Sequence, residues 1–433
     1  MASLNKTTVS ARRSFWLCLV FVVACSGCSD SDSSASPSLV GFGTDTVAGN
    51  GGQVIRVTSL AESGAGSLRE ALETAGPRIV VFEVGGVIDL QQRGLSISEP
   101  FITIAGQTAP SPGITIIKGG LTIFTHDVLM QHISIRPGDA GQPKGSGWEP
   151  DGISTSGGDA FNIVIDHCSL TWAVDENLSA SGPATEGPDA TSHRITFSHC
   201  IIAEGLDDSS HAKGPHSKGS LIHDFVRDVS IIGCLYAHND QRNPYFKAFT
   251  TGVIVNNVIY NPGSWAIQLF YVQSEWVGTG LTPENGRFSI VGNVLYHGVD
   301  TLNGLHMLGP FGDVYMHDNV AWDQNGVAAE IAYAIVVELD EPPLWPEGLV
   351  SRLSSDTTEW VLQNVGARPG DRDPIDARIV ATVRDRTGGI IDSQDDVGGY
   401  PSYSPTTRRL RVPEDPKVVD VWLASFSKAV LPN

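Results

Sequence analysis

The chain has 433 residues, including 47 glycines and 25 prolines, and a formal net charge of −20 at pH 7. This length allows one large domain or two ordinary ones, and the many glycines and prolines predict frequent turns. The negative charge, with no long basic block after the first thirteen residues, argues against nucleic acid as a partner. It leaves an acidic substrate open, because a local cationic site can lie within an acidic surface.

The first residues have the features of an export signal. Arg12 and Arg13 precede the apolar run 15–23, which is too short to span a bilayer. The sequence Val-Val-Ala-Cys, which ends at Cys25, resembles a lipoprotein cleavage box, and Cys28 is a second candidate for the lipidated residue. An ordinary cleaved signal with incidental cysteines is the alternative. In either case we expect the mature domain to be exported.

These features predict how the chain is divided. We expect a lipoprotein-type signal peptide at residues 1–28, a flexible tether rich in Ser and Asp at 29–38, a main domain at 39–345 and an extension at 346–433. A lipidated protein of this kind would lie in the cell envelope, at the outer membrane or the cell surface. It would contact a membrane only through the lipid, and without lipidation it would be extracellular. We expect a monomer.

The six cysteines fall into two groups. Three lie in or beside the signal, and the other three are Cys168, Cys200 and Cys234, which cannot all pair with one another. No Cys-x-x-Cys pair follows residue 28, which argues against a zinc site.

A short unit recurs along the chain: a polar residue or glycine, then a brief apolar strand. Its steps of roughly 24 to 36 residues are typical of a solenoid. The units are His132–Ile135, His167–Leu170, His199–Ile202, Gly233–Tyr236, Asn257–Tyr260, Asn293–Tyr296 and Asn319–Trp322. Their β-branched residues and turn asparagines, with almost no helical periodicity, predict an all-β fold, a parallel β-helix.

Equivalent residues of successive rungs stack at about 4.8 Å in such a coil. We therefore expect the three cysteines after the signal to stack inside it, unbridged, as small buried hydrophobic side chains. We expect Asn257, Asn293 and Asn319 to form a turn ladder, since Asn tolerates left-handed backbone.

The two ends of the coil carry different signals. Ser67 and Glu70 form a capping-box pattern, which predicts a short helix that could cover the open N-terminal end. Residues 346–433 lose the repeat and hold loops rich in Pro, Asp and Arg. We expect this extension to pack along the coil or to cover its C-terminal end, with a separate small domain as the alternative.

The repeat also predicts which polar residues share an edge. Arg242 follows Cys234 by eight residues, and acidic residues follow the two earlier cysteines by seven and eight. These acids are Asp175 and Glu176, then Asp207 and Asp208. Turns of similar length would bring them and Arg242 to one edge of three successive rungs. Carboxylates gathered there with few cations indicate a site for a hard cation such as Ca²⁺.

Several stretches together resemble the pectate lyases of the first polysaccharide lyase family. They are Gly64–Ala71, Ile104–Pro110, Ile165–Ser169, Arg242–Pro244, Asp376–Val380 and Ile391–Asp395. The resemblance covers most of residues 40–400 and implies a right-handed parallel β-helix. It also implies an acidic polysaccharide substrate, polygalacturonate, cleaved by calcium-assisted β-elimination to 4,5-unsaturated oligogalacturonates.

The same resemblance implies roles for three cations. Arg242 matches the arginine taken as the base that removes the C5 proton. Lys213 resembles the lysine that contacts the uronate carboxylate. Lys247 stands where the family carries a second, substrate-binding arginine, so the charge is kept and the planar geometry is not.

The resemblance also implies calcium ligands. Asp151 and Asp175 resemble ligands of the family, and the neighbouring Glu176 is a further candidate. Ser179 stands where many members have another ligand, which leaves the number of calcium ligands open.

Two other functions fit the same sequence. A β-helical glycoside hydrolase would need paired carboxylates with a water, for which Asp207 and Asp208 are the obvious candidates. A surface polysaccharide-binding protein would bind without turnover. The product separates these functions, because only a lyase makes an unsaturated uronate.

Overall fold

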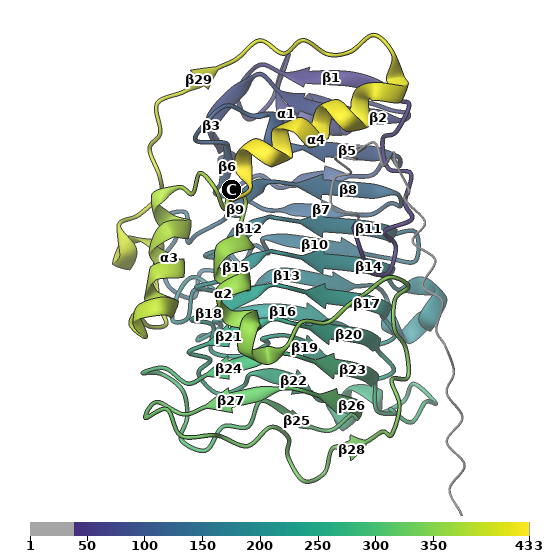
Figure 1. The fold of residues 1–433 in the computed structure, drawn as a ribbon, viewed down its shortest axis with the longest axis vertical. Helices are drawn as coiled ribbons and strands as arrows, with labels where there is room; N and C mark the ends of the chain where they lie inside the picture. Colours follow the sequence, from purple (N-terminus) through teal and green to yellow (C-terminus); the bar gives the residue numbers. More distant parts are fainter. Residues whose placement is uncertain (1–38, 433) are drawn as a thin grey trace, which may run out of the picture. The chain divides into compact units, whose positions relative to one another are not determined.

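Residues 39–432 are described by a computed structural model of the chain. They form three sheets whose strands follow one another rung by rung around a coil, as a parallel β-helix (Figure 1). Each full rung contributes one strand to each sheet, in the order first, third, second along the chain. The predicted fold class is confirmed. The predicted signal peptide, tether and lipidated cysteine lie outside the described residues.

The strands of the three sheets have these bounds. The first sheet holds β1 (Gln53–Val57), β2 (Arg78–Phe82), β5 (Ile102–Ala105), β8 (Val128–Gln131), β11 (Phe161–Asp166), β14 (His193–Ser198), β17 (Arg227–Ile232), β20 (Thr251–Val255), β23 (Arg287–Val291), β26 (Asp313–His317) and β28 (Val337–Glu338). The second holds β4 (Leu95–Ile97), β7 (Leu121–Ile123), β10 (Ile153–Ser156), β13 (Glu176–Ser181), β16 (Lys218–Ile222), β19 (Tyr245–Phe246), β22 (Ile267–Leu269) and β25 (Leu308–Pro310). The third holds β3 (Val84–Asp89), β6 (Ile114–Ile117), β9 (Ile133–Arg136), β12 (Ser169–Thr171), β15 (Ile201–Ala203), β18 (Leu235–Ala237), β21 (Val258–Tyr260), β24 (Val294–Tyr296), β27 (Val320–Trp322) and β29 (Thr406–Thr407).

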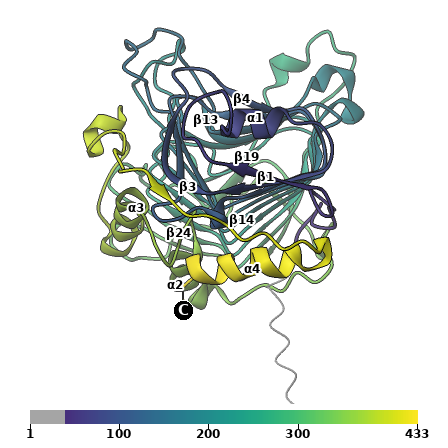
Figure 2. The same ribbon diagram turned by 90° about the horizontal axis from the view of Figure 1, so that it is seen from above.

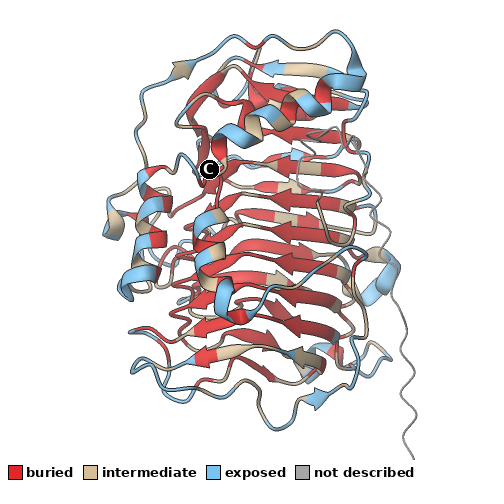
Figure 3. Cartoon of the chain, in the orientation of Figure 1, coloured by how far each residue is buried: buried red, intermediate tan, exposed pale blue. Residues whose placement is uncertain are grey.

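The core is a set of apolar columns that run through the rungs. Ile163, Ile195 and Val229 pair in register on β11, β14 and β17, and all three are fully buried. Figure 3 shows this burial along most of the strands. Alternate residues point into the coil, so the short β-branched runs of the sequence become columns in van der Waals contact.

From the β8 rung to the β26 rung, the turn between the first and third sheets places one residue per rung in left-handed backbone. These residues are His132, His167, His199, Gly233, Asn256, Gly292 and Asp318. The predicted asparagine ladder is present one residue later: Asn257 Nδ2 donates to Asn293 Oδ1 at 2.9 Å, and Asn293 Nδ2 donates to Asn319 Oδ1 at 2.9 Å. Tolerance of left-handed backbone was the wrong reason for this ladder. The ladder asparagines hydrogen-bond to one another, and the residue before each of them has the left-handed backbone.

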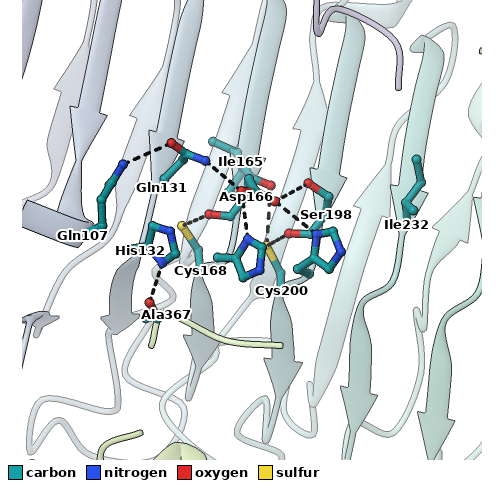
Figure 4. A network of polar contacts seen from close by, with 12 residues as sticks. Gln107, Gln131, His132, Ile165, Asp166, Cys168, Ser198, Cys200, Ile232 and Ala367 are labelled. Atoms are coloured by element: carbon teal, nitrogen blue, oxygen red, sulfur yellow. Dashed lines mark hydrogen bonds and ion pairs between the residues drawn. The ribbon is translucent and has the colours of Figure 1, made fainter. Parts of the chain in front are cut away.

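The three cysteines are fully buried and unbridged, as predicted, in the part of the chain that the structure describes. Cys200 and Cys234 touch through the Cys200 N–H and the Cys234 Sγ at 3.4 Å. Beside them, Asp166 accepts from Gln131 and Ser198 (Figure 4). The buried sulfur atoms and this hydrogen-bonded group therefore lie side by side at the corner between the first and third sheets.

A stack of histidine rings completes this turn. The rings of His132, His167 and His199 stack at centroid distances of 5.1 Å and 4.5 Å. Burial opposes ionisation of Asp166, but the hydrogen bonds and charges of His167 and His199 hold the pKa of its carboxyl well below the usual range. The three histidines therefore serve as stacked turn residues of successive rungs.

The N-terminal end of the coil begins with the predicted short helix. Helix α1 (Leu68–Glu73) starts at Ser67, whose side chain accepts from the Glu70 N–H at 3.2 Å. Leu68, Ala71 and Leu72 are buried in the same core as the rungs. The helix therefore closes the apolar interior near its first strands.

The C-terminal extension packs on the coil. Helices α2 (Ser354–Asn364) and α3 (Pro374–Asp385) cover the outer face of the third sheet with a shared apolar cluster that includes Val361 and Ile379. The chain then returns to the N-terminal end, where β29 pairs antiparallel with β3. Helix α4 (Val419–Val430) crosses the first strands there (Figures 1 and 2). Of the two expected placements, packing along the coil is observed.

A buried ion cluster anchors α3. Arg136, at the end of β9, is fully buried, and its Nη2 lies 2.7 Å from Asp376 Oδ1 and 2.9 Å from Asp373 Oδ2. Asp373 also caps α3, accepting from the Ile375 and Asp376 N–H groups. Burial, with the charge of Asp373, raises the pKa of Asp376 to about 6.

Removing this arginine should detach the extension. We expect Arg136→Ala to lower the free energy of unfolding by about 3–5 kcal/mol, because two buried carboxylates lose their cation. Arg384→Ala is the control, since Arg384 pairs with Glu359 at the surface and its loss should cost less than about 1 kcal/mol. Urea denaturation at neutral pH measures the free energy of unfolding of both variants. Similar small decreases in the two would contradict the anchoring role of Arg136.

Candidate active site

The site lies where strands of the second sheet begin. Asp151 precedes β10, Glu176 and Lys218 open β13 and β16, and Gln241 pairs with Lys218 just before β19. Glu176 pairs directly with Lys218, and Ile153 pairs with Leu178, so Asp151 lies beside Glu176 by register. The backbone ladder thus brings residues distant in sequence into one column along successive rungs. We call these aligned positions the edge column.

Arg242 is aimed by an extra residue. Lys218 pairs with Gln241, and Leu221 pairs with Tyr245, so two residues of one strand face three of the next. Such a bulge bends the strand and redirects a side chain. Arg242, the first residue of the bulge, has left-handed backbone with φ of 63°. Its guanidinium turns back along the column to contact Glu176.

Three carboxylates meet beside Arg242. One oxygen from each of Asp151, Asp175 and Glu176 lies within 4.8 Å of the others. These acids belong to two adjacent rungs. The cysteine offset grouped Asp175 and Glu176 with Arg242, whereas Asp151 was a candidate only through the family resemblance. Calcium takes oxygen ligands in irregular geometry, so the chemistry and spacing of this set fit a Ca²⁺ site.

Ser179, three residues after Glu176 on β13, supports this set. Its hydroxyl donates to Asp151 Oδ2 at 2.9 Å, while the Glu176 N–H donates to Asp151 Oδ1 at 3.1 Å. Ser179 therefore orients a carboxylate at the place where the family resemblance implied another ligand.

The pKa values of Asp151 and Asp175 are shifted in opposite directions. Burial and the charge of Asp175 raise the pKa of Asp151 to about 7. Burial acts on Asp175 in the same direction, but the hydrogen bond and charge of His216, with Arg242 and His211, outweigh it and lower the pKa of Asp175. Two acids this close share their charge unequally, and a bound cation would favour ionisation of both.

Arg242 is also desolvated. Its side chain is 19% exposed, and its Nε is buried with no hydrogen-bond partner among the described residues. The guanidinium lies 5.8 Å from the centre of the Tyr245 ring. Burial lowers the pKa of Arg242, and the charge of Asp175 opposes that shift.

The two predicted substrate-binding lysines lie in different surroundings. Lys213 is exposed on the loop between β15 and β16, and its N–H donates to His211 Nδ1 at 3.0 Å. Lys247 is buried and held by two carboxylates, Asp224 at 2.9 Å and Glu275 at 2.5 Å. A substrate carboxylate would have to displace Glu275, which is half exposed, to reach Lys247.

Lys218 was missed by the sequence analysis. It is 4% exposed and lies in the edge column between Glu176 and Gln241, with its Nζ 3.8 Å from Asp240 Oδ2. Burial lowers its pKa, opposed by the charges of Asp240 and Asp207. The long excursion before β16 hid its register, although the Lys-Gly-Ser-Leu-Ile strand itself is visible in the sequence.

Two histidines from the same excursion were also missed. His216 Nε2 lies 2.8 Å from Asp175 Oδ1, and the His211 ring stacks on the His216 ring at 3.8 Å. Asp175, His211 and His216 have the composition of a metal site. However, His211 Nδ1 accepts the Lys213 N–H, so its Nε2 carries the proton and is a donor. We infer that His216 holds Asp175 in place and that His211 holds the loop that carries Lys213.

The candidate hydrolase pair lies outside the carboxylate cluster. The Asp207 N–H donates to Ile391 O at 2.8 Å, and Asp208 contacts Lys144 at the surface. Burial raises the pKa of Asp207. The two residues are tied to the C-terminal extension and to a surface lysine.

The pKa of Asp151 predicts how stability depends on pH when calcium is chelated. Between about pH 4 and 7 the folded protein holds a proton on Asp151 that the unfolded chain has lost, so stability should fall as pH rises through this window. Asp151→Asn removes this dependence, and we expect it to melt above the wild type at pH 8 and with it near pH 4.

Melting temperatures in chelator across this range test the prediction. Asp189→Asn is the control, because that side chain is 99% exposed and should give no pH-dependent difference. A constant gap between Asp151→Asn and the wild type would contradict the assignment.

No helix in residues 39–432 is long and apolar enough to cross a membrane. No family model matches the chain. Among solved structures, the major cedar pollen allergen jun a 1 is similar with a TM-score of 0.55 and 17% identity, over 76% of this chain and 93% of its own. A pectate lyase bound to hexasaccharide has a TM-score of 0.52 and 14% identity, over 79% of this chain and 100% of its own. These likenesses show the fold.

Curated relatives are closer in sequence. The probable pectate lyase C of Emericella nidulans is 32% identical over 373 residues, which cover 84% of this chain and 80% of that protein. The probable pectate lyase C of Aspergillus oryzae is 31% identical over 380 residues, covering 84% and 81%. Identity at this level over most of both chains shows common descent, and this chain belongs to the pectate lyase family.

Proposed function

We propose that this protein is a secreted pectate lyase that cleaves polygalacturonate by calcium-assisted β-elimination. The observation that carries the proposal is the contact of Arg242 with Glu176 inside a cluster of three carboxylates. An arginine and hard-cation ligands at one edge are what recognition of a uronate requires. The proposed anchor at the N-terminus rests on the sequence alone.

The reaction needs a base, a place for the uronate carboxylate and a proton for the leaving group. The C5–H and C4–O4 bonds break, a C4=C5 double bond forms, and the departing O4 takes up a proton. Calcium bound by Asp151, Asp175 and Glu176 would neutralise the uronate carboxylate and so acidify the C5 proton.

Arg242 is the proposed base. A guanidinium in water holds its proton too strongly for this role, since its pKa exceeds about 12. Burial lowers the pKa of Arg242 and so favours its neutral form. In that form one nitrogen of the guanidino group has lost its proton and can accept another. The bulge keeps this nitrogen at the edge where the acids lie.

Lysines complete the proposed recognition of the substrate. Lys213 is exposed on a loop that His211 ties to Asp175, so it can reach a carboxylate near the proposed calcium site. Lys218 lies within the edge column and adds a buried lysine between Glu176 and Gln241. Lys247 would bind substrate only in exchange for Glu275.

The decisive variants change Arg242. Arg242→Ala should lose roughly 10² to 10⁴ in rate, the usual cost of a missing base. Arg242→Lys should lose nearly as much, because an ammonium does not reproduce the planar fork. The ultraviolet absorbance of the unsaturated product measures turnover, and thermal melts check the fold.

Arg287→Ala is the matched control, since Arg287 is exposed on the first sheet. If Arg242→Ala keeps more than about a tenth of wild-type turnover, the base is another residue. Products without a double bond would instead identify a hydrolase. Binding that Arg242→Ala leaves unchanged, without any product, would identify a binding protein.

Calcium dependence has its own test. After exhaustive chelation we expect turnover on de-esterified polygalacturonate to disappear and to return with added Ca²⁺. Asp175→Ala should weaken calcium binding, measured by calorimetry, by about tenfold or more, since one charged ligand is lost. Asp189→Ala should bind as the wild type does. Full activity in chelator, or unchanged calcium affinity in Asp175→Ala, would exclude this site.

A further inference from the structure

The edge column continues past the residues discussed so far. The Trp265 N–H donates to Asp240 O at 3.2 Å, which places Trp265 one rung beyond Gln241. Ile267 pairs with Leu308, so Trp265 and His306, each two residues earlier, also lie side by side. The column that holds Glu176 and Lys218 therefore runs on through two rings.

These rings form one partly exposed aromatic group. His306 stacks almost parallel on Tyr333 at a centroid distance of 4.0 Å, and Trp265 lies 5.7 Å from the same Tyr333 ring. All three are partly buried, neither sealed in the core nor free in solvent. We call Trp265, His306 and Tyr333 the ring cluster.

The position of Trp265 is fixed by backbone bonds to the Arg242 rung. Its N–H donates to Asp240 O, and its carbonyl accepts from Asn243 Nδ2 at 3.0 Å. Asn243 follows Arg242 directly in the chain. A ring set by the same rung as the proposed base has a defined place relative to it, which is what a substrate subsite requires.

A second observation points to a ligand. The Nδ1 of His306 is buried and has no hydrogen-bond partner among the described residues. A buried polar atom without a partner is costly, and most such atoms in folded proteins are satisfied. A 180° flip of the His306 ring keeps its stack on Tyr333 and exchanges Nδ1 with the opposite ring edge. In that orientation a hydroxyl or carboxylate of a sugar lying on the ring cluster would supply the missing partner.

We propose that the ring cluster is a saccharide subsite that holds the uronan chain on the C-terminal side of Arg242. The apolar C–H face of a pyranose packs on the Trp265 ring, and a polar group of the same or the next sugar bonds His306 Nδ1. Rungs repeat at about 4.8 Å, comparable with the length of one sugar residue, so a polymer aligned with the edge column meets Trp265 and then His306. This inference rests on the proposed function, because it takes the lyase substrate as its ligand.

The subsite acts on long substrates more than on short ones. A chain that reaches past Arg242 gains the ring contacts, and a fragment too short to reach them does not. Loss of Trp265 should therefore raise KM for oligomers long enough to reach the ring cluster, leave KM of shorter ones unchanged, and leave kcat within about twofold, because the contact is made equally in the ground and transition states.

The test measures binding and turnover of oligogalacturonates from two to eight units. In an Arg242→Ala background, calorimetry of Trp265→Ala should show about tenfold weaker binding of the longest oligomer and unchanged binding of the shortest. Trp265→Phe keeps an aromatic face and should recover most of the loss. Trp322→Ala is the matched control, since Trp322 is a surface tryptophan on the third sheet, 37% exposed.

The outcomes separate this subsite from the proposed function. A wild type that binds and cleaves pectate, with Trp265→Ala affinities equal at every length, overturns the subsite alone. Equal losses at every length, with a lowered melting temperature, identify a structural tryptophan and also overturn it. If Trp265→Ala does not fold, Trp265→Phe and His306→Ala carry the same length series. A wild type that forms no unsaturated product overturns the proposed function.

Discussion

The hydrogen bonds between consecutive rungs govern this molecule. Apart from β29, each strand pairs in parallel with its counterparts one turn of the coil before and after, which fixes the register of the strand positions with little freedom. Residues with nothing in common in the sequence, such as Asp151, Glu176 and Lys218, become neighbours because they occupy the same position on successive rungs. The same ladder produces the apolar columns, the cysteine stack and the asparagine ladder, so the core and the site are results of one periodic constraint.

The site depends on one local break in this periodicity. A strict ladder would place Arg242 opposite its counterpart on β16, and the extra residue before β19 turns it back toward Glu176. The surrounding charges are then balanced locally. Lys218 lies near Asp240, and Lys247 lies between Asp224 and Glu275, so both buried lysines are paired with carboxylates, while Lys213 is exposed at the surface.

The sequence was informative wherever spacing is regular. The seven-to-eight residue offset after each cysteine correctly grouped Asp175 and Glu176 with Arg242, because the turns of those rungs are similar in length. The offset did not bring Asp207 and Asp208 into the carboxylate cluster, and it did not find Lys218, since the excursion before β16 has its own path. The return of β29 to β3 follows from apolar and backbone contacts between distant segments, for which the sequence has no periodic signal.

That return places the last helix of the chain over its first strands. The outer faces of Ile79 and Val81 on β2 are covered by Val419 and Leu423 of α4, and the Arg408 N–H bonds Glu83 O. Because β2 precedes α4 by most of the coil in the chain, the opening rungs wait for this cover until α4 has been synthesised and docked. Until then, the opening rungs expose apolar surface and a free strand edge, which are the features that invite pairing with other chains. Burial of the first rungs is therefore tied to the docking of a segment made much later.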